Sequence, residues 1–418
     1  MQRTQRLDVS LTLPFAAVWA LLAPEAVPAD RRPDRSRLSI ATFNARFLFD
    51  GVAPEGEAGF PWKDDAVSAR KHLQSIAALL RPLDADVIHI SEVEDLGTLR
   101  RLGLEIGDPT YEAYLIPGHD EFTRQNVGLL TRVDPDGPLA RTDERAAAHD
   151  GEAPQGVPKI YAARITAGRW PLTLVGAHLL AFPEDPERIP RREGQAEVLR
   201  RFAAEEGTLR GRLVVLLGDL NDFDPEVPDA AGNLPSSRVL EILKTVDLRT
   251  SEDDLWNPAE LLPLEERFTA FVDRNLDGRD GGLAERSLTD HVLVSARLRP
   301  AVAAIEVLAS HDPLGASDHF PLRVVLDSSR AEIFIRGDAA GNGSVGLDDV
   351  HAILRHLFAG EPVSCADAAD ADDDGKLSVT DAIFLLRGIL GLEGRLPAPG
   401  PVFPGFDPTG DELSPCRG

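Results

Sequence analysis

Positive charge is scarce in this sequence of 418 residues. Lys and Arg together number 44 against 69 Asp and Glu, which gives a formal net charge of −25. A chain with this balance does not hold nucleic acid through a broad basic surface. If its substrate carries phosphate, local cations or bound metal ions must offset the repulsion between the two.

Long hydrophobic runs are also rare. The one candidate runs from Val9 to Leu22 and is too short and too interrupted for a good membrane span. Arginines precede it and small residues follow it, which is the layout of a secretory signal peptide. We therefore expect a signal peptide over residues 1–29, a linker over residues 30–37, and a protein that is secreted, periplasmic or at the cell surface. The alternative is a lightly packed N-terminal arm.

Cysteine is nearly absent. The two that occur, Cys365 and Cys416, lie in the last part of the chain. Export would place them in an oxidising environment, where we expect them to form a disulfide that ties the tail to the body. Two free thiols are the alternative.

Short apolar runs alternate with amphipathic patterns over nearly three hundred residues. Such interleaving predicts one layered α/β or α+β domain, which we place at residues 38–327. The expected strands are Leu38–Phe43, Val87–Ile90, Val127–Leu130, Leu172–Val175, Leu213–Leu217, His291–Val294 and Leu322–Leu326. The expected helices are Ala66–Leu80, Arg191–Glu205 and Ser236–Val246, the last capped by its serines.

Polar side chains follow many of these strands, where loops carry function on a rigid scaffold. Each alone has an ordinary explanation as a turn former, a surface acid or a core histidine. Together they supply what phosphate-ester hydrolysis requires: oxygen ligands for a hard divalent cation, a group to orient water, and donors for the transition-state charge. The set is Asn44, Glu92, His178, Asp219, Asn221, Asp290, Asp318 and His319. The nearby Asp222 and Asp224 are explained by a turn.

Six segments carry a family resemblance. In order they are ATFNARFLF, DVIHISEVE, VGAHLLAF, VVLLGDLND, SLTDHVLVS and ASDHFPLRV. They resemble the endonuclease/exonuclease/phosphatase superfamily, which includes deoxyribonucleases, abasic-site endonucleases, sphingomyelinases and inositol polyphosphate phosphatases. The resemblance implies an α+β fold, a four-layered α/β sandwich of two packed sheets flanked by helices, and phosphoester hydrolysis with Mg²⁺ or Mn²⁺. It says much less about the substrate.

The resemblance also implies metal and substrate ligands. Glu92 is the principal metal ligand, Asn44 helps to hold metal and water, and Asp318 binds metal. Arg124 and Asn126 occupy positions where relatives place groups that contact phosphate.

The catalytic groups follow from the same resemblance. Asp219 and Asn221 orient the attacking water and the phosphate, and Asp219 is a candidate base. His319 contacts the scissile phosphate or serves as base. Asp290 orients His319 and raises the pKa of its imidazole. His178 donates to the phosphate.

Three positions depart from the family pattern. Ser91 stands where Gln usually precedes the metal-binding Glu, Ala177 where Thr or Asn often precedes the histidine, and Arg46 where secreted nucleases often carry Glu. None removes a core catalytic group, but together they blur the subfamily.

A second acidic stretch lies just before Asp290. Asp273, Asn275, Asp277 and Gly278 begin like a calcium loop, but Ala284 stands at the twelfth position, where an acid is usual. A calcium site and a plain solvated loop both remain open.

Residues 331–392 contain two similar units, each a loop rich in Asp and Gly followed by an apolar helix. The second loop has oxygen ligands at the positions that a twelve-residue calcium loop requires. These are Asp370, Asp372, Asp374, Lys376 through its carbonyl, Ser378 and Asp381. The first loop has Asp338, Asn342 and Asp349 in register but Ala340 at its third position, so it should bind more weakly.

One helix per loop and Asp at the twelfth position resemble dockerin modules. The resemblance implies a small all-α domain that needs Ca²⁺ to fold, because its carboxylates would otherwise repel one another. Whether it docks to another protein or to its own chain stays open. Residues 393–418 form a tail rich in Pro and Gly.

These observations predict a secreted, divalent-metal-dependent phosphodiesterase, in first place an extracellular nuclease. The alternatives are a sphingomyelinase- or phosphatase-type enzyme, and a non-catalytic binding protein assembled through the C-terminal module. The sequence offers no aromatic hairpin for membrane insertion, which favours nucleic acid, and retention of every catalytic group argues against a non-catalytic protein. We expect a monomer without a transmembrane segment.

Overall fold

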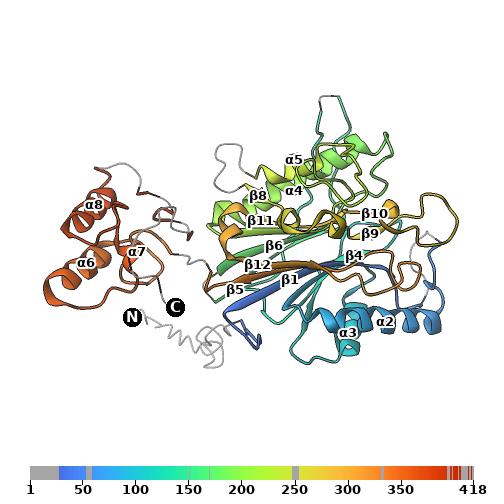
Figure 1. The fold of residues 1–418 in the computed structure, drawn as a ribbon, viewed down its shortest axis with the longest axis horizontal. Helices are drawn as coiled ribbons and strands as arrows, with labels where there is room; N and C mark the ends of the chain where they lie inside the picture. The colour runs from blue at the N-terminus through green and yellow to red at the C-terminus, as the bar shows by residue number, and fades with distance from the viewer. Residues whose placement is uncertain are drawn as a thin grey trace, which may run out of the picture.

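The computed structural model describes residues 28–52, 59–149, 151–168, 170–246, 254–330 and 334–392, and in the tail 396–397, 399–402, 404–405, 413 and 416. The predicted signal peptide, apart from its last two residues, and much of the tail lie outside these ranges. In the described part, two sheets pack face to face with helices on their outer sides, and a helical unit follows in the chain (Figure 1). No described helix is long and apolar enough to cross a membrane.

The first sheet has six strands in the order β12-β13-β1-β2-β4-β3. Strands β1 and β2 run parallel, and the other neighbours run antiparallel. The strands are β1 Arg37–Leu48, β2 Val87–Val93, β3 Glu112–Tyr114, β4 Asn126–Thr131, β12 Val302–Val307 and β13 Leu322–Asp327. Helices α2 (Ala66–Leu80) and α3 (Leu96–Ile106) cover its outer face, and Asp65 and Asp95 cap their first turns.

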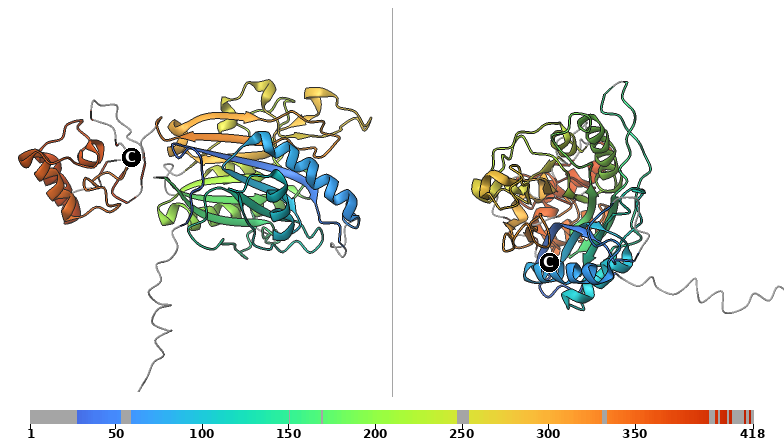
Figure 2. Two further views of the ribbon diagram at one scale, coloured as in Figure 1. Left: turned by 90° about the horizontal axis from the view of Figure 1, so that it is seen from below. Right: turned by 90° about the vertical axis from the view of Figure 1, so that its right-hand side faces the viewer.

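The second sheet has five strands in the order β5-β6-β7-β11-β8. Strands β6 and β7 run parallel, and the other pairs run antiparallel. The strands are β5 Ile160–Ala167, β6 Trp170–His178, β7 Leu213–Asp219, β8 Leu255–Trp256 and β11 Asp290–Ser295. Helices α4 (Ile189–Glu206) and α5 (Val239–Lys244) lie on its outer side, and the end-on view in Figure 2 shows helices above and below the strands.

Smaller elements complete the domain. A two-stranded hairpin joins β9 (Ala270–Phe271) to β10 (Arg286–Ser287). The 3₁₀ helices are η1 Arg81–Leu83, η2 Thr208–Arg210, η3 Pro258–Leu261, η4 Leu264–Glu266, η5 Gly282–Glu285 and η6 Ala296–Ala301.

The main core lies between the sheets. Inward-facing side chains such as Ile40, Leu174 and Val215 are fully buried and belong to one continuous apolar cluster. The opposite faces of the same strands pack against the helices, so the central strands are buried on both sides. This explains why their sequences are nearly continuous apolar runs instead of alternating patterns.

The predicted architecture of two packed, mixed sheets flanked by helices is confirmed. Each of the seven predicted strands lies within an observed strand, and the three predicted helices are present. The predicted serine cap of α5 is wrong in part. Arg238 is the N-cap residue and its backbone N–H donates to Glu193. The Ser237 hydroxyl nevertheless accepts from the Val239 N–H at 3.2 Å, as predicted, and it also donates to Asp222.

The C-terminal unit contains helices α6 (Leu347–Ala359), α7 (Ala366–Ala369) and α8 (Val379–Ile389). Its core is a separate small cluster that includes Ile353 and Leu385. The predicted disulfide between Cys365 and Cys416 is present and fastens the tail beside α7.

A buried histidine lies between the two sheets. His89 on β2 is fully buried, with Nδ1 3.1 Å from the Tyr161 hydroxyl and Nε2 3.1 Å from Ser91 Oγ. Gly176 and Gly218 face it from the second sheet. A Cβ atom at those positions would lie 2.5 Å and 3.0 Å from the imidazole nitrogens, so the close approach of the sheets requires glycine there. Burial lowers the pKa of His89 to about 3.

The depressed pKa of His89 predicts acid sensitivity. The unfolded chain takes up this proton near its ordinary pKa of 6.5, whereas the folded chain resists until about pH 3, so stability falls as pH drops through this window. We expect His89 to account for a loss of about 2 kcal/mol between neutral pH and about pH 5. Chemical unfolding at both pH values should show a smaller loss in His89→Gln, even though the variant starts from lower stability. An equal loss in both proteins would contradict the assignment.

Candidate active site

Three of the predicted polar residues meet at one end of the second sheet. The parallel pairing of β6 and β7 places His178 beside Asp219, and the antiparallel pairing of β7 and β11 places Asp290 on the other side of Asp219. All three side chains are buried. Strand register therefore brings together three residues that span more than a hundred positions of the chain.

The first sheet contributes Asn44 from β1 and Glu92 from β2. The Asn44 side-chain amide donates to Glu92 Oε1 at 3.1 Å and to Asp219 Oδ2 at 3.0 Å, so it joins the two sheets. Glu92 has φ +63°, a left-handed conformation that is uncommon outside glycine. Its Oε2 also accepts from the Phe47 backbone N–H at 3.0 Å, so the surroundings hold the carboxylate in place.

The loop before β13 completes the site with Asp318 and His319. His319 Nδ1 lies 2.6 Å from Asp290 Oδ2, and its Nε2 lies 3.9 Å from Asp219 Oδ2. The Ser317 hydroxyl anchors the loop by donating to the Asn44 carbonyl at 2.8 Å. The imidazole is thus fixed through one nitrogen and directs the other towards Asp219.

Electrostatic interactions between these groups shift their pKa values. Burial, and then the charge of Asp290, raises the pKa of Asp219 to about 7. Burial alone would lower the pKa of His319, but the charge and hydrogen bond of Asp290 outweigh it and hold the pKa well above the usual range. Burial, with the nearby charges of Lys159 and His319, pushes the pKa of His178 well below the usual range.

The donor set fits a divalent cation. Ligand atoms of Asp219, Asp290 and His319 lie within 4.8 Å of one another. Asp290 Oδ1 is buried without a hydrogen-bond partner among the described residues, and Asp219 is crowded by other carboxylates. A hard cation held by oxygen ligands beside this cluster would offset its negative charge.

The predicted ligands Glu92 and Asn44 border this cluster, whereas Asp318 is turned partly to solvent. Its carboxylate lies 3.7 Å from Arg46 Nε. Arg46, the position that departs from the family pattern, therefore already provides Asp318 with a positive partner.

The two predicted substrate contacts, Arg124 and Asn126, lie at the start of β4 and just before it. Arg124 is exposed and has φ +58°. The Asn126 amide donates to the Glu94 carbonyl at 2.5 Å and accepts from the Gly118 N–H at 2.6 Å, so it also supports the local backbone. Between them, Gln125 donates to Glu92 Oε2 at 3.1 Å. Sequence reasoning missed Gln125 because only its place between two candidates could have marked it.

Asn221 lies beside Asp219, and its contacts within the described structure are with protein groups. Its backbone N–H donates to Asp219 Oδ1 at 3.1 Å, and its side-chain amide donates to the Leu179 carbonyl at 3.2 Å. With φ +51°, Asn221 turns the chain sharply after β7. These contacts hold the Asp219 carboxylate.

The model of the Endonuclease/Exonuclease/phosphatase family matches residues 41–319, which contain all eight of the polar residues described above. The chain belongs to this family. Its members are phosphoester hydrolases and use divalent metals such as Mg²⁺. No curated protein matches the sequence.

Solved structures of the endonuclease/exonuclease/phosphatase fold are similar at low identity. A 3'-5' exonuclease from Neisseria meningitidis is 17% identical, with a TM-score of 0.46 over 69% of this chain and 100% of that chain. An endonuclease/exonuclease/phosphatase from Bacteroides vulgatus is 17% identical, with a TM-score of 0.44 over 70% and 98%. A family protein from Bacteroides thetaiotaomicron is 16% identical, with a TM-score of 0.42 over 69% and 97%.

Two further carboxylates of the endonuclease/exonuclease/phosphatase domain follow Asn221. Asp222 pairs with Arg192 of α4 at 3.1 Å, and both side chains are fully buried. Asp224 pairs with Lys244 at 2.7 Å. The predicted turn is therefore an incomplete explanation. Both carboxylates also form ion pairs with basic side chains, and these pairs hold the loop after β7 against the helices.

The two C-terminal loops adopt one conformation. Asp370 accepts from the N–H groups of the fifth and sixth loop residues, at 3.2 Å and 2.8 Å, and Asp338 accepts from its equivalents at 2.9 Å each. Ligand atoms of Asp370, Asp372 and Asp374 lie within 4.8 Å of one another. Burial and then the charges of Asp372 and Asp370 raise the pKa of Asp381 to about 7.

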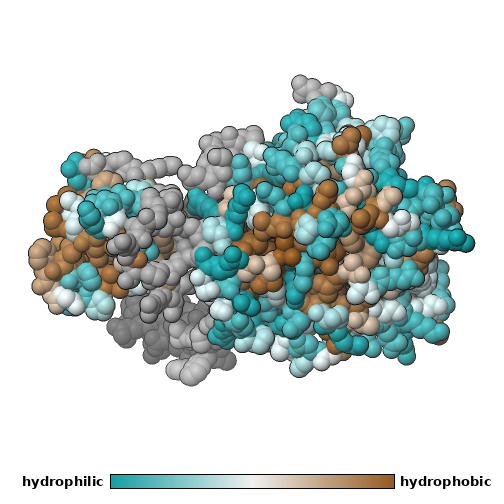
Figure 3. Space-filling view, viewed as in Figure 1, coloured by the Kyte–Doolittle hydropathy of each residue, from teal (hydrophilic) through white to brown (hydrophobic). Residues whose placement is uncertain are grey.

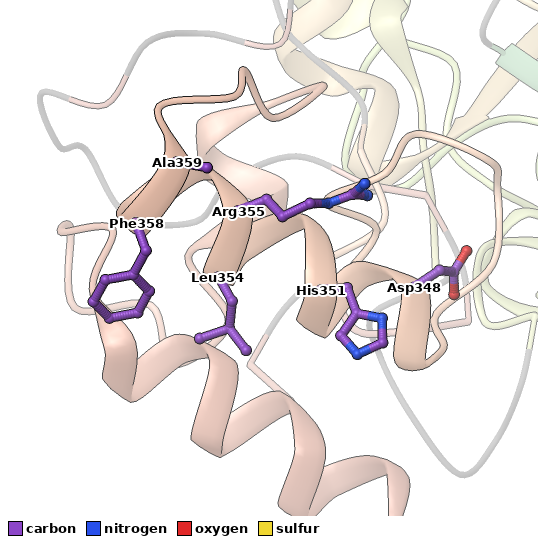
Figure 4. Close-up of a pocket in the computed structure, with 6 residues that line it drawn as sticks. All are labelled: Asp348, His351, Leu354, Arg355, Phe358 and Ala359. Atoms are coloured by element: carbon purple, nitrogen blue, oxygen red, sulfur yellow. The ribbon is translucent and has the colours of Figure 1, made fainter.

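A shallow hollow lies on α6, outside the endonuclease/exonuclease/phosphatase domain. Its lining residues are Asp348, His351, Leu354, Arg355, Phe358 and Ala359 (Figure 4). Phe358 is 78% exposed, and Figure 3 shows apolar surface gathered on this unit. None of the strand-end polar residues lines the hollow, so it is separate from the phosphoester chemistry.

The buried pair of Arg192 and Asp222 gives a stability prediction for the site. Arg192→Leu leaves the Asp222 charge buried without its partner and should destabilise the domain by about 3–5 kcal/mol. The neighbouring Arg191 is exposed, so Arg191→Leu serves as the matched control and should change stability little. Chemical unfolding of both variants measures the difference, and equal stability of the two would show that the pair is dispensable.

Proposed function

We propose that this chain is a secreted, divalent-metal-dependent phosphodiesterase that acts as an extracellular nuclease. The observation that carries the proposal is the cluster of Asp219, Asp290 and His319, with Glu92 and Asn44 beside it, where the two sheets meet. It combines anionic ligands for a cation with a histidine whose charge is stabilised by a carboxylate.

The cluster assigns a separate task to each residue. His319, held charged by Asp290, donates from Nε2 to a phosphate oxygen and stabilises the charge that builds up there. Asp219, whose pKa lies near 7, accepts a proton from the attacking water. Neutral His178, with Nε2 3.6 Å from Asp219 Oδ2, donates a further hydrogen bond.

A divalent cation would be held by Glu92 with Asn44, and with Asp318 at the exposed side. When bound, it would polarise the phosphate and offset the repulsion between the substrate and an acidic protein. This accounts for a phosphoester substrate despite the net charge of −25.

Export is supported by two features. The N-terminal layout of arginines, an apolar stretch and small residues matches a signal peptide. The Cys365–Cys416 disulfide is of a kind that persists outside the cytoplasm. We propose a secreted or cell-surface monomer.

Activity assays test the enzymatic proposal. Metal-free protein should hydrolyse DNA or RNA only after Mg²⁺ or Mn²⁺ is added, and Asp219→Asn and His319→Gln should each lower kcat by about 10³. Glu144→Gln removes an exposed carboxylate that makes none of these contacts and should leave kcat unchanged.

Sphingomyelin, a phosphomonoester and a chromogenic phosphodiester complete the substrate panel. Hydrolysis of one of these without nuclease activity would replace the nuclease by another phosphoester hydrolase. A folded wild-type protein inert on the whole panel would refute the enzymatic proposal.

We also propose that the C-terminal unit is a dockerin-like module with two Ca²⁺ sites. In the second site Asp370, Asp372, Asp374, Ser378, Asp381 and the Lys376 carbonyl are the ligands, and in the first Asp338, Asn342 and Asp349. The close carboxylates and the raised pKa of Asp381 support binding of a cation. The exposed face of α6 is the surface it offers to a protein partner.

Chelation tests the module. Removing Ca²⁺ should lower the melting temperature of the C-terminal unit, because repulsion among the loop carboxylates is then uncompensated. In calorimetry, Asp370→Asn should melt early even with Ca²⁺, whereas Glu144→Gln should melt as the wild type does. A profile indifferent to chelator would count against calcium in these loops.

A further inference from the structure

The loop between β9 and β10 resembles the two C-terminal loops in its backbone contacts. Asp273 Oδ1 accepts from the Asp277 N–H at 3.2 Å, and its Oδ2 accepts from the Gly278 N–H at 2.9 Å. These are the fifth and sixth loop positions, the same two that bind Asp338 and Asp370 in their loops.

The backbone turns in the same places. The sixth residue is glycine in all three loops, with φ of +70° at Gly278, +84° at Gly343 and +76° at Gly375. The fourth residue also has positive φ, including +58° at Leu276, which is 87% exposed and is not held there by packing. In this loop Asp273 and Asn275 both direct a side-chain oxygen to the Asp277 N–H, at 3.2 Å and 2.9 Å.

Glu285 takes the place of the missing acid at the twelfth position. Its Oε2 accepts from the N–H of Gly281, the ninth loop residue, at 2.7 Å. Asp349 and Asp381 accept from the ninth residues of their loops at the same distance. The longer Glu side chain, one residue later, reaches the position that Asp fills in the other loops.

The second carboxylate oxygen of Glu285 has no partner in the described part of the chain, which suggests that it binds a ligand. Although the loop is exposed, Glu285 is only 4% exposed, and its Oε1 is buried without a hydrogen-bond partner among the described residues. Its carboxylate lies against Gly281, on the loop itself. A buried carboxylate oxygen without a partner is costly, so this arrangement calls for a cation.

The neighbouring arginines do not supply that cation within the described structure. Arg274 pairs with Glu184 at 3.0 Å and donates to Asn233 at 2.7 Å. Arg286 pairs with Asp280 at 2.6 Å and stacks on phenylalanine rings at the base of the hairpin. Arg274 is therefore committed elsewhere. Arg286 holds Asp280 through Nη2, and its Nη1 has no hydrogen-bond partner among the described residues, so neither guanidinium hydrogen-bonds Glu285 Oε1.

We propose that this loop is a third calcium site, located in the catalytic domain. The ligands are the side chains of Asp273, Asn275, Asp277 and Glu285 and the carbonyl of Arg279. An all-oxygen set on a pliable loop suits Ca²⁺ better than Mg²⁺, which demands a small octahedral shell and retains its waters. This site does not depend on the proposed enzymatic function.

Calcium here would order a hairpin that touches the active site. The Phe271 N–H donates to the Asp318 carbonyl at 2.8 Å, and the Asp290 N–H donates to Thr269 Oγ1 at 2.9 Å. The β9 end of the hairpin therefore holds the segments that carry Asp290, Asp318 and His319. Calcium would support these residues without touching the substrate.

Calcium counting on the full-length, metal-free protein tests the site. Titration calorimetry with CaCl₂, run in excess Mg²⁺ so that the proposed catalytic site is already filled, should give three calcium sites in the wild type and two in Glu285→Gln. Glu184→Gln, which removes a carboxylate beside the loop that is not a ligand, should keep three. If Glu285→Gln binds as many ions as the wild type, the proposal is overturned.

A double variant separates this site from the C-terminal ones. Asp338→Asn with Asp370→Asn should retain one site, and adding Glu285→Gln should abolish it. If the C-terminal loops bind no calcium, the wild type and the double variant will both show one site, and Glu285→Gln will still remove it. No site in the double variant would overturn the proposal.

Hydrogen exchange distinguishes loss of the calcium site from misfolding of the variant. Calcium should slow exchange of the Gly278 and Gly281 amides by about tenfold in the double variant, and this protection should vanish in Glu285→Gln while the β7 and β11 amides stay protected. Equal protection with and without calcium would overturn the proposal.

Discussion

Holding several carboxylates together at the meeting edge of two sheets is the constraint on which the catalytic domain depends. Asp219 and Asp290 face each other across β7 and β11, and Glu92 approaches Asp219 from the other sheet. If all of them were ionised in a buried site, they would repel one another. Protonation and contacts with donors or cations reduce this repulsion. His319 neutralises Asp290, Asn44 donates to Glu92 and Asp219, and a divalent cation would take up the remaining charge.

The approach of the two sheets makes this arrangement possible. His89 fills the space between them, and Gly176 and Gly218 leave room for its ring. Both glycines lie just before candidate catalytic residues, His178 and Asp219. The residues that let the sheets pack closely are therefore neighbours in sequence of the polar residues. The packing of each strand end determines where the polar side chain that follows it lies.

Much of the fold could be predicted from the sequence because the central strands are buried on both faces and appear as apolar runs. Strands β5 and β12 were missed because Arg164 and Glu306 interrupt their patterns; in the structure these charges pair with Glu206 and Arg323. The strand-end residues were found through sequence motifs. In the structure, the register of the strands brings these residues together. Gln125 and Glu285 were missed because their roles depend on where a side chain reaches in space, and the backbone contacts of the Asn126 amide were missed for the same reason.

The Asn44 amide has a consequence for folding experiments. It donates to one carboxylate on each sheet, so neither sheet alone contains the complete constellation. A refolding chain could regain its strands and helices, and with them its circular dichroism, before the sheets dock in register. The constellation would then form last, and its recovery would report the docking of the two halves and not the formation of either one.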